Sequence, residues 1–191
     1  MNTEITLSTI QSLVDGNLEN PGSLLGSHAI NYRGREARAI RTLQPEAQSM
    51  WVIETETGER RPMRRLHPGG FFEAILENSR SQQYRMQMID KQGNEIETTE
   101  PYTTPSVLTD FDRYLLGEGR HFDMYNRLGA HVRVVDGVAG TNFAVWAPNA
   151  RAVQVVGDFN GWDGRRHAAQ VHPNLGIWEI FVPGASVGEK Y

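Results

Sequence analysis

The chain has 191 residues, of which 39% are hydrophobic and 22% are charged, as in a globular protein with room for one large domain or two ordinary ones. Its formal net charge of −4 argues against nucleic acid or an anionic membrane as a partner, since both bind clusters of Lys and Arg. Cysteine is absent, which excludes disulfides and thiolate chemistry, and the lack of a signal peptide or of an apolar run of about 18 residues predicts a cytoplasmic protein.

The first half of the chain predicts one helix followed by strands. Residues 3–16 carry apolar side chains at helical spacing, with Thr3 or Thr6 able to cap the helix and Gly16 able to end it. From about residue 28 the apolar side chains recur with period two, which predicts strands separated by turn residues. The expected strands are residues 36–43, 49–55, 61–66, 71–77, 83–90 and 94–98. A hairpin turn is expected between the last two, at residues 91–94.

A linker and a second strand-rich stretch make up the rest of the chain. Residues 99–109 contain two prolines and read as a linker, and residues 110–117 read as a short helix that Thr109 or Asp110 can cap. The strand pattern resumes after Leu128. The strands expected here are residues 131–136, 141–146, 151–156, 177–182 and a start at 189.

The two strand-rich stretches contain an internal repeat. Residues 25–28 (LGSH) recur 103 positions later as residues 128–131 (LGAH), and residues 72–76 are echoed by residues 178–182. The preserved order of these matches predicts two copies of one β-sandwich with about seven strands each. The alternative is a chance similarity between two unrelated β domains.

We therefore expect an all-β fold of two tandem immunoglobulin-like β-sandwiches, with short helical segments at the N-terminus and in the linker. The expected domains are residues 1–105, a linker with a short helix at 106–127, and a second sandwich at 128–191. The second sandwich is predicted to be truncated, because Tyr191 matches Tyr84, after which the first copy continues into two more strands. Without those strands, an edge stays unpaired over an uncovered core.

Residues 141–162 (TNFAVWAPNARAVQVVGDFNGW) resemble the family 48 carbohydrate-binding modules that precede the catalytic barrel of α-glucan-active enzymes. Residues 114–121 and 125–131 resemble the linker and the module opening of bacterial 1,4-α-glucan (glycogen) branching enzymes, and residues 24–28 resemble their extra N-terminal domain. The resemblance implies the non-catalytic, N-terminal part of such an enzyme. Its two sandwiches are expected to position glycogen or maltooligosaccharide chains for a catalytic barrel in cis.

The resemblance ends before the part of a branching enzyme that performs chemistry. It implies a (β/α)₈ barrel with an aspartate nucleophile and a glutamate acid/base, and such a barrel needs about 250 residues. We therefore expect no catalytic residue in this chain and no branching activity from it alone. One alternative is a free-standing glycogen-binding adaptor, which the incomplete second sandwich disfavours. Another is the front end of a debranching enzyme or trehalohydrolase, which the duplicated domain disfavours.

Two residues of the motif are candidates for carbohydrate binding. Trp162 follows a tight polar turn, and an exposed indole can cover the apolar face of a pyranose; the tryptophan of this segment often forms the glucan platform in the family. The alternative is that Trp162 packs on its own domain or on the barrel. Asn160 can hydrogen-bond a sugar hydroxyl, although Asn-Gly is first of all a turn dipeptide. The aromatic residues expected in the core are Trp51, Phe143, Trp146 and Trp178.

No metal site or cofactor is expected. Residues 158–164 fail as a calcium loop, because Trp162 stands where an oxygen ligand is required. His167 and His172 have no third ligand nearby in the sequence, so a zinc site is not predicted. The resemblance also implies a lysine and an aromatic residue beyond Tyr191, so the expected sugar site is incomplete within these 191 residues.

Overall fold

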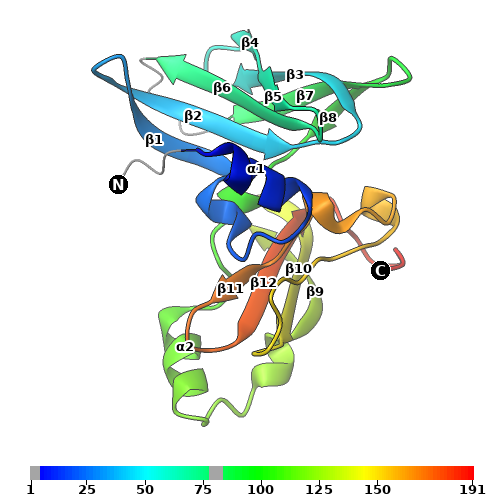
Figure 1. Ribbon diagram of the computed structural model, residues 1–191. Coiled ribbons are helices and arrows are strands. Elements are labelled where there is room, and N and C mark those ends of the chain that lie inside the picture. The colour runs from blue at the N-terminus through cyan, green and yellow to red at the C-terminus, as the bar shows by residue number, and fades with distance from the viewer. Residues whose placement is uncertain (1–4, 78–83) are drawn as a thin grey trace. The chain divides into compact units, whose positions relative to one another are not determined.

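The computed structural model describes residues 5–77 and 84–191, and these form an almost entirely β structure (Figure 1). Within the described residues, three four-stranded antiparallel sheets and two short α-helices make up most of the regular structure. The chain divides into two compact units. The first holds residues up to Val14 and Leu24–Glu100, and the second holds Asp15–Ser23 and Pro101–Tyr191. The predicted all-β class is confirmed.

The expected N-terminal helix forms as α1 (Leu7–Val14), and it buries Ile10 and Leu13. Thr6 caps it as predicted, since its hydroxyl oxygen accepts a hydrogen bond from the Thr9 N–H at 3.2 Å. The chain turns just beyond the helix at Gly16, which adopts the left-handed conformation (φ 71°) that glycine enters without steric cost. The first residues of the expected range, 3 and 4, lie outside the described residues.

The first unit is a sandwich of two sheets. The first sheet has the order β1-β2-β6-β5 and consists of β1 (Gly26–Tyr32), β2 (Arg35–Leu43), β6 (Phe71–Glu77) and β5 (Arg64–His67). The second sheet has the order β4-β3-β7-β8 and consists of β4 (Arg60–Pro62), β3 (Ala47–Glu54), β7 (Tyr84–Asp90) and β8 (Glu95–Thr98). Apolar side chains of both sheets meet in one core, among them Ile40, Met50, Val52, Phe72, Leu76, Met86 and Met88.

Two expectations for the first unit were wrong in detail. The single strand expected at residues 61–66 is divided into β4 and β5, with Met63 buried between them. Trp51 is not a core residue: β3 turns Met50 and Val52 into the core, so the alternation of the strand puts Trp51 on the outer face. There the guanidinium of Arg60 lies 4.1 Å from the centre of the Trp51 ring, in a cation–π contact.

The second unit contains one sheet with the order β11-β12-β10-β9. Its strands are β9 (Gly129–Val135), β10 (Val138–Trp146), β11 (Gln170–His172) and β12 (Ile177–Pro183). Before the sheet, the chain forms helix α2 (Asp110–Gly117) and the 3₁₀ turns η2 (Pro101–Thr103) and η3 (Met124–Asn126). Between β10 and β11 it forms the 3₁₀ turns η4 (Asp158–Asn160) and η5 (Gly164–Arg166). The one further short turn, η1 (Pro21–Ser23), also belongs to this unit. The core joins the sheet to the irregular segment before η4, and it includes Phe143, Val153, Val155, Trp178, Ile180 and Val182.

The sheets of the two units repeat one another closely. Strands β1 and β2 begin and end 103 positions before β9 and β10, and the sheet orders correspond. In both copies a histidine ring nitrogen hydrogen-bonds a carbonyl three residues earlier at 2.9 Å, His28 to Leu25 and His131 to Leu128. The turn after the first strand has two positive φ values in each copy, at residues 33–34 and 136–137. Chance similarity does not explain such local agreement.

The expected strand at residues 151–156 does not form, and neither does a strand starting at 189. Residues 151–156 make one isolated bridge, between Gln154 and Ala168, whereas their counterpart β3 is paired on both sides, by β4 and β7. A strand exists through its hydrogen-bonded neighbours, and in the described part of the chain no strand pairs with the second edge of this segment. Strands β1 and β11 were not anticipated. No helix within residues 5–77 and 84–191 has the length and hydropathy to cross a membrane.

Candidate carbohydrate-binding site

Trp162 stands on a strained turn of the second unit. The turn η4 ends at Gly161, and both Gly161 (φ 61°) and Trp162 (φ 63°) adopt the left-handed conformation. For a bulky residue such as tryptophan, this conformation costs about 1–3 kcal/mol and persists only where the surroundings enforce it. The Trp162 N–H donates to the Gly157 carbonyl at 3.0 Å, which closes the turn.

Asn160 holds this turn from the inside. The residue is buried, and its Oδ1 accepts a hydrogen bond from the Gly157 N–H at 2.9 Å while its Nδ2 donates to the Val155 carbonyl at 2.8 Å. Because one partner is a backbone donor and the other a backbone acceptor, the positions of Oδ1 and Nδ2 in the Asn160 amide are fixed. Nδ2 also lies 2.9 Å from Nδ1 of His167, which must therefore accept the hydrogen bond and carry its proton on Nε2.

His167 is a neutral member of this network. Burial, assisted by the neighbouring positive charge of Arg166, lowers the pKa of its imidazole from 6.5 to about 3. The Phe159 ring meets the imidazole edge-on, with ring centres 5.5 Å apart. Because Nδ1 accepts from Asn160, protonation of His167 would break the hydrogen bond that anchors the turn.

The indole of Trp162 is presented to solvent, with 55% of the residue exposed. Its Nε1–H donates to Oδ1 of Asp158 at 3.2 Å, so one edge of the ring is tethered. The structure thus brings the two predicted residues into one turn, but it gives them different surroundings. All the hydrogen bonds of the Asn160 side chain go to the protein, and its contact with sugar stays a prediction, as does that of Trp162.

Of the three aromatic residues expected in the core of this unit, two are buried and one is exposed. Phe143 and Trp178 are buried as expected, with exposed fractions of 8% and 2%. The expectation for Trp146 was wrong, since 62% of this residue is exposed at the end of β10. Its counterpart in the repeat, Leu43, is 2% exposed in the first unit.

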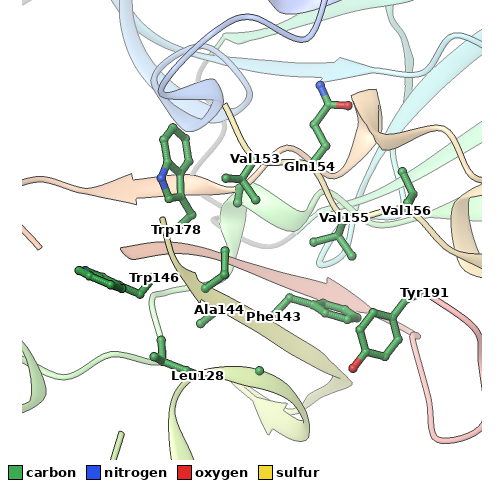
Figure 2. A pocket seen from close by; sticks show the side chains of 13 residues that line it. Leu128, Phe143, Ala144, Trp146, Val153, Gln154, Val155, Val156, Trp178 and Tyr191 are labelled. Carbon is green, nitrogen blue, oxygen red and sulfur yellow. The ribbon is translucent and has the colours of Figure 1, made fainter. Parts of the chain in front are cut away.

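Beside Trp146 the second unit has an open apolar groove of about 590 Å³ (Figure 2). Side chains of β10 line it together with the segment 153–156, which lacks a strand partner on this edge. Tyr191 also lines the groove, with its ring 5.1 Å from that of Phe143. In the first unit the equivalent strand β3 pairs with β7 along this edge.

A buried carboxylate lies on the other face of the second unit's sheet. Trp178 and Ile180 point into the core, so Glu179 between them points away from it. Its oxygens accept hydrogen bonds from four donors, on Ser106, Val107, Asn142 and His172, at 2.5, 3.0, 3.2 and 2.7 Å. Burial raises the pKa of Glu179, but hydrogen bonds from His172 and Ser106 outweigh it and lower the pKa below its ordinary value.

Asp112, at the start of α2, is a second buried carboxylate that accepts several hydrogen bonds. It completes a capping box with Thr109, and its Oδ1 accepts hydrogen bonds from His121 at 2.8 Å and Arg127 at 3.1 Å. Burial raises the pKa of this carboxyl, but these hydrogen bonds lower it far below its usual range. His172 is likewise engaged with Glu179, and no three His, Asp or Glu side chains in the described parts of the chain gather to hold a metal ion.

The two-sheet sandwich of the first unit, and the repetition of one of its sheets in the second, place the chain in the class of antiparallel β-sandwich proteins. Residues 6–102 match the model of the alpha-1,4-glucan branching enzyme GlgB N-terminal domain, and residues 127–191 match carbohydrate-binding module 48 (isoamylase N-terminal domain). The first match covers just over half of the chain. The chain belongs to the family of alpha-1,4-glucan branching enzyme GlgB N-terminal domains, as its motifs predicted.

Curated relatives named 1,4-alpha-glucan branching enzyme GlgB support this assignment. The protein from Rhodopirellula baltica is 65% identical over 193 residues, which cover 100% of this chain and 26% of that protein. Those from Paramagnetospirillum magneticum and Rubrobacter xylanophilus are 44% and 45% identical, over 98% and 95% of this chain, and each match covers 24% of the relative. The chain thus spans about a quarter of the length of the curated relatives it matches.

Proposed function

We propose that this chain binds α-glucan through Trp162 and positions it for the catalytic domain of a 1,4-α-glucan branching enzyme, in the cytoplasm. The observation that carries the proposal is the half-exposed indole, tethered by one edge on a turn that the protein keeps in a strained conformation. Rigid aromatic platforms bind well because little side-chain freedom is lost on binding. A glucan held beside a catalytic domain reacts at a raised local concentration.

Within this proposal the residues of the turn have separate tasks. Trp162 covers the apolar face of a glucose ring, and Asn160 keeps the turn in shape through hydrogen bonds to Gly157, Val155 and His167. Covering half of an indole contributes about 1–2 kcal/mol at roughly 25 cal/mol per Å² of apolar surface. This corresponds to about a tenfold change in Kd.

The proposal assigns residues 1–105 and 128–191 to two sandwich domains and residues 106–127 to the linker between them. It also holds that the 191-residue chain transfers no glucan chains by itself, since both family matches fall on non-catalytic domains. Incubation of the purified chain with amylose, followed by debranching and analysis of chain lengths, tests this. New α-1,6 branches would contradict it. The match of residues 6–102 to the branching-enzyme domain favours this function over a glycogen-binding adaptor or a debranching enzyme.

Binding of maltoheptaose and glycogen to the purified chain tests the role of Trp162. We expect saturable binding that Trp162→Ala weakens about tenfold or more. Trp146→Ala is the matched control, because Trp146 is also an exposed tryptophan of the second unit but does not belong to the turn. Equal binding by the wild type and Trp162→Ala would refute the proposal, as would an equal loss in both tryptophan variants.

A further inference from the structure

We propose that Asp158 is a positioning residue for glucan binding, which holds the Trp162 indole in the orientation that receives the sugar. This inference rests on the proposed function of Trp162. Asp158 opens the turn η4 and is itself exposed, so a role in the core does not account for its side chain. What its carboxylate does in the structure is to accept the hydrogen bond of the indole N–H, at 3.2 Å.

The carboxylate is a firm anchor because the backbone of Asp158 is fixed on two sides. Its N–H donates to the Lys190 carbonyl at 3.0 Å, and its own carbonyl accepts from the Gly161 N–H at 3.4 Å. The second carboxylate oxygen, Oδ2, accepts from the Lys190 N–H at 3.4 Å. Both carboxylate oxygens are thus engaged, and the side chain cannot rotate without breaking one of these hydrogen bonds.

This anchor restrains the indole without covering it. A hydrogen bond to the ring N–H lies near the plane of the ring, so it limits rotation of the side chain and leaves the apolar faces uncovered. A free tryptophan side chain on the surface would have to be ordered when sugar binds. The Asp158 contact makes that ordering part of the folded state, which strengthens binding without any contact between Asp158 and the ligand.

The test compares Asp158→Ala with Asp158→Asn in the 191-residue chain, with maltoheptaose as the ligand. The amide oxygen of asparagine can still accept from the indole N–H, with loss of only the longer hydrogen bond from the Lys190 N–H, whereas alanine accepts from neither. We expect Asp158→Ala to raise Kd about two- to tenfold and Asp158→Asn to stay within about twofold of the wild type. Time-resolved anisotropy of tryptophan fluorescence, read against Trp162→Phe, should show a more mobile indole in Asp158→Ala alone.

A double-mutant cycle separates this mechanism from a general structural effect. Trp162→Phe keeps an aromatic face but removes the N–H, so Asp158→Ala should cost little further affinity in that background. If Asp158→Ala weakens binding equally in both backgrounds, or if Asp158→Asn is as impaired as Asp158→Ala, the positioning role is wrong. Full binding by Asp158→Ala would also overturn it. Full binding by Trp162→Ala would instead refute the proposed function itself.

Discussion

Glu179→Ala should destabilise the second unit strongly, because the buried carboxylate satisfies four donors at once. A hydrogen bond to a charged group is worth about 1.5–3 kcal/mol, and a buried donor left without a partner costs about 1–3 kcal/mol. These contributions are not additive, so the loss of the four hydrogen bonds together should cost about 3–5 kcal/mol, which is less than their sum. We expect a loss in this range, which is a large share of the roughly 5–15 kcal/mol that holds a domain folded.

Glu179→Gln should cost much less, about 1–2 kcal/mol. The amide oxygen can take the place of Oε1 and accept from Val107 and Asn142, and the amide nitrogen can take the place of Oε2. The amide nitrogen would then donate a hydrogen bond to the Ser106 hydroxyl, which donates to Glu179 in the wild type. It would also donate to Nε2 of His172, which accepts when the ring carries its proton on Nδ1. The difference between the two losses in unfolding free energy therefore shows whether the hydrogen bonds of Glu179 or its negative charge contribute more to the stability of the second unit.

Denaturant unfolding followed by tryptophan fluorescence measures both variants, because Trp146, Trp162 and Trp178 all lie in the second unit. Glu118→Ala is the control, since Glu118 is exposed and its substitution should stay within about 0.5 kcal/mol. The folded-state pKa of Glu179 lies below its ordinary value of 4.5, so its contribution is present above pH 4.5 and is lost as the pH falls below it. A loss under about 1 kcal/mol for the alanine variant would refute this reasoning.

Two further predictions concern the same unit. His167, with its pKa lowered from 6.5 to about 3, should stay neutral in the folded protein, so the free energy of unfolding should fall as the pH drops from 6.5 towards 3; an NMR titration of this imidazole near pH 6.5 would contradict it. Gly140→Ala should cost about 1–3 kcal/mol, because a Cβ there would lie 2.5 Å from the Val182 carbonyl oxygen. Gly117→Ala is the control, because Gly117 lies at the end of α2, has no left-handed φ and would have no atom within 4 Å of the added Cβ; it should change the stability by about 0.5 kcal/mol or less. A reversed order of the two melting temperatures would show that the packing argument is wrong.

Local patterns in the sequence predicted the parts of the fold that depend on neighbouring residues. Strand β6 begins and ends where the alternation of residues 71–77 does, and β7 and β8 flank the expected turn at 91–94. Helix α2 begins after its predicted cap, Thr109. In each case the signal is a property of a few consecutive side chains, either a period of two or a turn or capping residue.

Patterns failed where a strand or a core position depends on distant partners. Residues 151–156 alternate like a strand, yet among residues 5–77 and 84–191 no strand pairs with their second edge, and they make one isolated bridge. Trp51 and Trp146 lie on true strands, β3 and β10, but which face of a strand is buried depends on what packs against it. The exposure of Trp146 and the outer-face, half-buried position of Trp51 could not be read from the alternation of the sequence alone.

The sequence by itself determined that the chain contains a repeated β unit, that its motifs resemble those of branching-enzyme N-terminal domains and of carbohydrate-binding module 48, and that residues 158–162 form a turn carrying Trp162. Only the tertiary structure decided how that turn is held. Asn160 is buried against His167, and Asp158 tethers the indole while its own backbone bonds to Lys190. The first two contacts join residues seven and four positions apart, and the third joins residues 32 positions apart. Hydrogen bonds of this kind follow no periodicity, so the pattern of the sequence does not predict them.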